Sequence, residues 1–88
     1  MPWHTSSDPL TLPAGKHYST DNHLRVEPGA GNVQVQQLRS DGVTWFTPSA
    51  AEYTISVEDS YRIDRRNAPP LRIIATGDAK FELFGALT

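Results

Sequence analysis

Short stretches of alternating apolar and polar residues, separated by turn signals, constrain the fold of this chain more than any other feature. Tyr53, Ile55 and Val57 alternate with threonine and serine, which is the two-residue period of a half-buried strand. Similar stretches occur at 24–27, 33–38, 43–47, 61–64, 71–75 and 80–84. About seven short strands, spaced roughly 8 to 12 residues apart, predict an all-β fold. No stretch keeps a helical period, so the only helix expected is a single turn near 49–52.

The residues between these stretches predict how the strands connect. Gly42 in Ser40-Asp41-Gly42 can adopt the positive φ that a tight hairpin needs. We expect three consecutive hairpins, over 33–46, 53–64 and 71–84. Leu38 is out of phase with Val33 and Val35, and a bulge near 36–37 would return it to the core. The prediction is an antiparallel β-sandwich, meander or jelly-roll-like.

The N-terminal residues differ from the rest because Pro2, Pro9 and Pro13 interrupt any regular element. We predict an extended N-terminal arm over 1–12 and a single β-sandwich domain over 13–88. Trp3 and Leu10 are apolar handles of this arm. They either tuck onto the domain or dock on a neighbouring subunit, where tryptophan is a common anchor. A chain this small buries roughly 64 % of its unfolded surface, so partners often add stability.

Composition limits the partners that the chain can attract. With 8 basic and 10 acidic side chains, the balance predicts no general binding to nucleic acid or to an anionic membrane. No apolar run approaches the ~18 residues of a transmembrane helix. The N-terminus lacks the basic and apolar regions of a signal peptide, and there is no cysteine. We expect a soluble protein that is made in the cytoplasm and not exported by the usual route.

No residue pattern indicates catalysis. His4, His17 and His23 lack the spacing of a metal site. No G-x-S-x-G motif is present, and the Gly29–Gly31 stretch lacks the Lys-Ser/Thr of a phosphate loop. The prediction is therefore no catalytic residue, no metal, no cofactor and no enzymatic activity.

Some side chains suggest an interface instead. Trp45 and Phe46 are adjacent, so they face opposite sides of a strand and one of them must be exposed or covered. The arginines between positions 62 and 72 are either solvated outward positions or a docking patch for an acidic surface. The predicted interface residues are Trp3, Leu10, Trp45, Phe46, Arg62, Arg65, Arg66 and Arg72.

Three motifs carry a resemblance. The stretch 33–45 ends in S-D-G-x-T-W, Tyr61-Arg62-Ile63 follows, and Pro70-Leu71-Arg72-Ile73 precedes Thr76-Gly77-Asp78-Ala79. Over residues 24–87 this pattern resembles small β-sandwich virion proteins of tailed bacteriophages, of the capsid decoration or cement type. The S-D-G-x-T-W element also occurs in β-sandwich modules that bind sugars.

The resemblance implies a virion structural protein on the capsid surface, which binds the major capsid protein and stabilises the head by bridging capsomers. It further implies a homotrimer or another symmetric homo-oligomer, with the N-terminal arm crossing a subunit boundary. Two alternatives stay open. One is a fibre, head–tail or baseplate module of a virion. The other is a carbohydrate-binding module that uses Trp45 or Tyr53 as a stacking platform.

Overall fold

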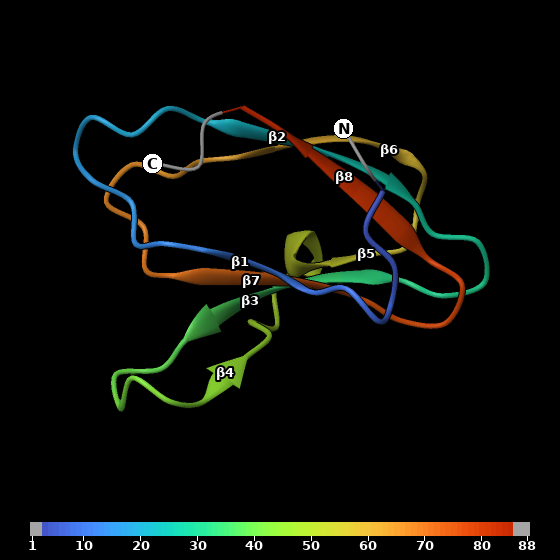
Figure 1. The fold of residues 1–88 in the computed structure, drawn as a ribbon, viewed down its shortest axis with the longest axis horizontal. Coiled ribbons are helices and arrows are strands. Elements are labelled where there is room, and N and C mark those ends of the chain that lie inside the picture. Colours follow the sequence, from blue (N-terminus) through green and yellow to red (C-terminus); the bar gives the residue numbers. More distant parts are fainter. Residues whose placement is uncertain (1–2, 86–88) are drawn as a thin grey trace.

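The protein is a sandwich of two antiparallel sheets, as Figure 1 shows for the computed structural model, which describes residues 3–85. One sheet is ordered β1 (Leu10–Leu12), β7 (Leu71–Ala75), β3 (Val33–Leu38) and β4 (Trp45–Phe46), with β5 (Thr54–Ile55) also pairing with β3. The other is ordered β6 (Asp59–Ile63), β2 (Asn22–Glu27) and β8 (Lys80–Phe84). A 3-10 turn, η1 (Ala51–Tyr53), precedes β5. The predicted all-β sandwich is confirmed, with eight strands in the described residues instead of about seven.

The core lies between the facing sides of the two sheets and follows the alternation in the sequence. In β2, Leu24 and Val26 are fully buried, whereas the intervening Arg25 is exposed. Val33, Val35 and Ile73 cover them from the other sheet. The remaining buried apolar residues are Leu12, Ile55, Leu71, Ala75, Ala79, Phe81 and Leu83. This is one thin core, as expected for so short a chain.

Only the first of the three predicted hairpins exists. β3 and β4 pair with Leu38 opposite Trp45, and Gly42 in their connection has a φ of 75°. The predicted hairpins over 53–64 and 71–84 are wrong, because β5 and β6 lie in different sheets, as do β7 and β8. The turn at 76–79 does reverse the chain, with Ala79 N–H bonded to the Thr76 carbonyl at 3.1 Å. It carries the chain across the core instead of along one sheet.

The predicted bulge in β3 is also absent. β3 pairs with β7 in unbroken register, from Val33 opposite Ala75 to Gln37 opposite Leu71. Leu38 therefore remains on the outer face of the five-stranded sheet, half-buried. It lies beside Trp45, its cross-strand partner, so an outer aromatic neighbour replaces the core contact that the prediction assumed.

The segment predicted as an arm is part of the sandwich. β1 pairs with β7, and Leu12 is fully buried. Further back, His4 exchanges two backbone hydrogen bonds with Phe81 of β8, at 2.7 and 3.0 Å, and its ring stacks on the Phe81 ring. The domain therefore begins before residue 13. Positions 1 and 2 of the predicted arm lie outside the described residues.

A buried arginine holds together the loops at one end of the sandwich. The side chain of Arg65 is fully buried. Its Nη2 donates to the Pro13 carbonyl at 2.6 Å and its Nη1 to Asn22 Oδ1 at 3.1 Å. The connection after β1 is bonded to the same loop through Gly15 N–H and the Ala68 carbonyl, at 2.8 Å. Arg65 thus joins the end of β1, the start of β2 and the β6–β7 connection.

We predict that Arg65→Met destabilises the protein by about 1–3 kcal/mol. Methionine keeps the volume of the buried stem but removes both donors, which leaves the buried Asn22 acceptor without this hydrogen bond. Urea unfolding followed by tryptophan fluorescence measures the change. Arg66→Met is the matched control, because Arg66 is exposed and should change the free energy of unfolding by less than about 0.5 kcal/mol. Equal values for the two variants would contradict a structural role of the guanidinium.

Candidate functional site

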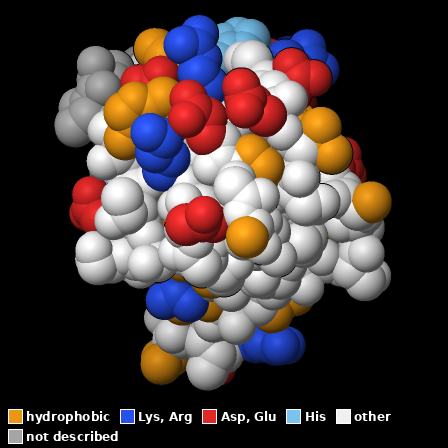
Figure 2. All heavy atoms as spheres, turned by 90° about the vertical axis from the view of Figure 1, so that its right-hand side faces the viewer, with side chains coloured by type: hydrophobic (Ala, Val, Ile, Leu, Met, Phe, Trp, Pro, Cys, Tyr) orange, Lys and Arg blue, Asp and Glu red, His pale blue; other side chains and the backbone are white. Residues whose placement is uncertain are grey.

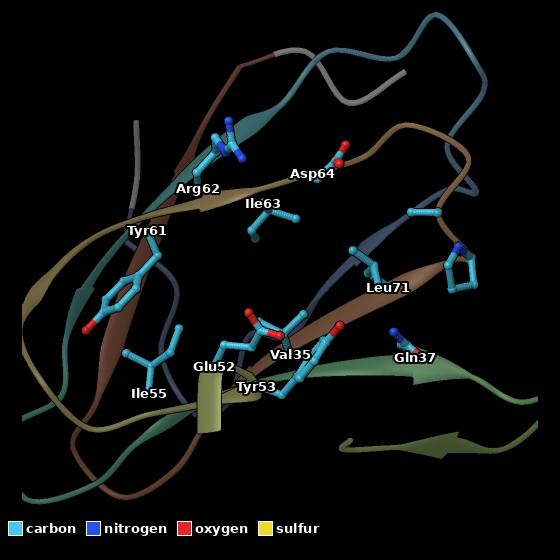
Figure 3. Close-up of a pocket in the computed structure, with 12 residues that line it drawn as sticks. Val35, Gln37, Glu52, Tyr53, Ile55, Tyr61, Arg62, Ile63, Asp64 and Leu71 are labelled. Carbon is cyan, nitrogen blue, oxygen red and sulfur yellow. The ribbon is translucent and has the colours of Figure 1, made fainter. Parts of the chain in front are cut away.

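An open cleft of about 500 Å³ lies between the sheets, beside β6 (Figure 3). Its apolar lining comes from both sheets: Val35 and Leu71 from the wide sheet, and Tyr61 and Ile63 from the narrow one. Tyr53 of η1 points into it from below in this view. The other lining residues are Gln37, Glu52, Ile55, Arg62, Asp64, Ala68 and Pro69. The cleft is therefore a mainly apolar hollow with a polar rim.

The cleft exists because the two sheets differ in width. Tyr61 and Ile63 pair with Leu24 and Asn22 of β2, so they face inward with those buried residues. Both nevertheless stay half-buried, since β6 is the last strand of its sheet. The Tyr61 hydroxyl donates to the Val57 carbonyl at 2.7 Å, which ties the chain entering β6 to the strand. Within residues 3–85, the result is a strand edge without a neighbouring strand, beside an open apolar wall.

The rim of the cleft carries charges of both signs. Arg62 forms an ion pair with Asp21 at 3.5 Å. A hydrogen bond from the Arg66 N–H lowers the pKa of Asp64, and the charges of Arg66 and Arg62 act in the same direction. Asp64 therefore remains a carboxylate throughout the physiological range. Figure 2 shows charged side chains gathered over the narrow sheet at the top of the view, whereas most of the remaining surface on that face is uncharged.

The outer face of the wide sheet carries a hydrogen-bonded row of polar side chains. Arg72 donates twice to Gln36 Oε1, at 2.9 and 2.6 Å. Gln36 in turn donates to Thr47 Oγ1 at 3.2 Å, and Thr47 donates to Gln34 Oε1 at 2.9 Å. The guanidinium of Arg72 also lies 5.1 Å from the centre of the Trp45 ring. This row fixes Trp45 on the outer face beside amide groups.

The structure separates most of the predicted interface residues. Trp45 and Arg72 lie together, Arg62 is at the cleft, and Arg66 is exposed in the β6–β7 connection. The other predicted residues contact their own chain: Trp3 lies against Lys80, Phe46 against Arg39, and Leu10 against the core. Arg65 is buried within the chain, so it does not belong to an exposed arginine patch.

The pairing in β3 and β4 decides which aromatic faces outward. Trp45 lies opposite Leu38 on the outer face, and Phe46 lies opposite Gln37, which lines the cleft. Arg72 lies against the half-buried Trp45 ring, and β1 is separated from β4 by β7 and β3 in the sheet. The cleft could not be predicted from the sequence because the widths of the two sheets depend on long-range pairing. The alternation of Gln34 and Gln36 with buried valines was a signal for the polar row.

Within residues 3–85, no group of three or more histidine, cysteine or acidic side chains is placed to hold a metal ion. No helix in this part of the chain is long and apolar enough to cross a membrane. Comparisons with known protein families, with curated proteins and with solved structures find no match to this chain.

The β3–β4 turn that presents Trp45 is held by one carboxylate. Asp41 accepts hydrogen bonds from the N–H groups of Thr44 and Val43, at 3.0 and 2.9 Å, and from the Thr44 hydroxyl at 2.8 Å. The Thr44 and Val43 N–H groups and the Thr44 hydroxyl lower the pKa of Asp41, with a smaller contribution from the charge of Arg39. The ionised form is therefore the one that holds the turn.

We predict that this turn loosens at acid pH. Because the pKa of Asp41 is lower in the folded state, its contribution is complete above the unfolded value of about 3.9 and is lost as the pH falls through the folded value. The Val43 and Thr44 amide signals in NMR should shift together, with a midpoint below that of an unstructured aspartate. Asp41→Asn removes this transition. A midpoint equal to the unstructured value would contradict the role of the carboxylate.

Proposed function

We propose that this chain is a virion structural protein, a decoration or cement subunit that binds the outside of a tailed-phage head and bridges capsomers. The observation that carries the proposal is the uncovered side of the sandwich, where the apolar cleft adjoins the unpaired edge of β6. An exposed apolar hollow beside an open strand edge is a feature that assembly covers. The sequence motifs that resemble decoration proteins support the same proposal.

The physical advantage of such a subunit is repetition. Each copy makes modest contacts with the major capsid protein, and hundreds of copies add their contributions to one shell. Because the subunit binds the assembled shell and not its separated parts, binding stabilises the shell by linkage. Arranging the subunits as a trimer or another symmetric homo-oligomer adds contacts between copies.

We predict that purified virions contain the protein in hundreds of copies, and that heads assembled without it bind it after expansion. Quantitative mass spectrometry of virions and co-sedimentation with such heads measure the two quantities. A few copies per virion would favour a fibre, head–tail or baseplate module. Absence from virions would overturn the proposal.

We further predict that Tyr53→Ser weakens head binding, because it removes an aromatic ring that lines the cleft. Losing one buried aromatic contact at an interface typically costs about 1–2 kcal/mol, which is roughly a 5- to 30-fold loss of affinity. Tyr18→Ser is the matched control, because Tyr18 is 62 % exposed and does not line the cleft. Equal binding by the two variants would exclude the cleft as the head-binding surface.

A carbohydrate-binding module is the second candidate, and the observation that favours it is Trp45 beside the polar row of Gln34, Gln36 and Arg72. An aromatic ring flanked by amides can stack on a sugar and bond its hydroxyls. If this candidate is correct, titration with glycans quenches the fluorescence of Trp45, and Trp45→Phe abolishes the response. Decoration predicts no response to any glycan.

A further inference from the structure

The open edge of β6 has a sequence that complements itself. In the segment 57–63, which is β6 and the two residues before it, two pairs of residues about Ser60 are complementary. In this arrangement Glu58 is matched with Arg62, and Val57 with Ile63. We propose that β6 pairs antiparallel with β6 of a second copy of this chain, about a twofold axis at Ser60.

The backbone at the centre of this edge faces outward, and its N–H is held only by a local contact. Ser60 N–H donates to the carboxylate of the preceding Asp59 at 2.8 Å. A strand residue gives its N–H to one side only, so this N–H is turned away from β2 and toward the open edge. In the dimer, the carboxylate is replaced by the Ser60 carbonyl of the second copy, and the two serines exchange both of their backbone hydrogen bonds.

Electrostatics selects this register among the alternatives. In an antiparallel pair, two residues that lie opposite each other place their side chains on the same face of the sheet. Because successive side chains alternate between faces, the twofold axis must pass through a residue and not between two residues. An axis at Asp59 places two carboxylates opposite each other, and an axis at Arg62 places two guanidiniums together. An axis at Tyr61 places Glu58 opposite Asp64. An axis at Ile63 would bring Arg62 opposite Asp64, but it would also place the fully buried Arg65 opposite Tyr61. Among the axes that leave Arg65 in its buried site, only the axis at Ser60 brings opposite charges together, and it does so twice because the interface is isologous.

The apolar residues agree with the same register. Val57 is 66 % exposed in the single chain, and Ile63 is half-buried at the cleft. Residues 57 and 58 lie outside β6 in the single chain. The axis at Ser60 places Val57 and Ile63 opposite each other at both ends of the pairing once these two residues join the strand and the Tyr61 hydroxyl gives up its bond to the Val57 carbonyl. Tyr61 then faces Asp59 of the second copy. The narrow sheet becomes a continuous six-stranded sheet, which runs past the open side of each protomer.

The first experiment exchanges the charges. Sedimentation velocity from micromolar to millimolar concentration should show a monomer–dimer equilibrium for the wild-type protein. Glu58→Arg and Arg62→Glu should each weaken dimerisation by about tenfold or more, because like charges then meet twice. The double variant should restore it. Lys16→Glu and Arg66→Glu are the controls, since both positions are exposed outside β6 and neither lines the cleft, and both variants should dimerise as the wild type does.

The second experiment fixes the register. The chain has no cysteine, so Ser60→Cys introduces a single thiol that lies on the axis. Opposed Cα atoms about 5.5 Å apart are within disulfide range, and mild oxidation should give a covalent dimer. Ser56→Cys is the control, because this exposed residue lies four positions from the axis and should remain monomeric.

Equal cross-linking by the two cysteine variants would overturn the proposal, as would a double charge variant that stays monomeric. The proposal does not depend on the virion function. Head binding is measured by co-sedimentation with heads, and dimerisation is measured in free solution. Either result can therefore fail without the other. The resemblance implies a homotrimer or another symmetric homo-oligomer; the dimer is of the second kind, and sedimentation distinguishes its mass from that of a trimer.

Discussion

The hydrogen bonds of the buried Arg65 guanidinium are the interaction on which the shape of the sandwich depends. A charged group removed from water is costly unless acceptors converge on it. The two acceptors that bind it, the Pro13 carbonyl and Asn22 Oδ1, are neutral and come from opposite ends of the β1–β2 connection. These two hydrogen bonds therefore hold that connection, which leads from one sheet to the other, against the loop that joins β6 to β7, although the buried Arg65 Nε has no hydrogen-bond partner among the described residues. The end of β6, and with it one wall of the cleft, is placed by this contact.

The unequal widths of the sheets then determine where the surface is incomplete. On one side, the N-terminal segment bonds to β8 through His4, which protects that edge of the narrow sheet. On the other side β6 has no neighbouring strand among the described residues, and the wide sheet extends past it through β4 and β5. The apolar residues Tyr61 and Ile63 are left beside an open edge, so both proposals for assembly concern the same side of the molecule.

Local properties of the fold could be predicted from the sequence, and pairing over long distances could not. The alternation at Leu24 and Val26 indicated a half-buried strand because side-chain period is a local property. The turn at 76–79 could also be predicted from the sequence. Turn residues indicate only that the chain reverses, and not which strand the returning chain pairs with. Whether β8 lies beside β7 or across the core depends on where β2 offers an edge. In the sequence, Arg65 stands in a cluster of charged residues that could be solvated. Its burial could not be predicted, because the acceptors that bind its guanidinium are 43 and 52 residues away.

The edge of β6 discriminates between partners in a way that an ordinary exposed strand does not. Asp59 pairs with the inward-facing Val26, so it places a charge on the core side of an edge strand, which discourages pairing with apolar strands. Its carboxylate also occupies the Ser60 N–H. A foreign strand would have to displace this contact and leave Glu58 and Arg62 without cross-strand partners. A second copy regains the hydrogen bond and pairs both charges, so the features that protect the edge from aggregation also select the chain itself as its partner.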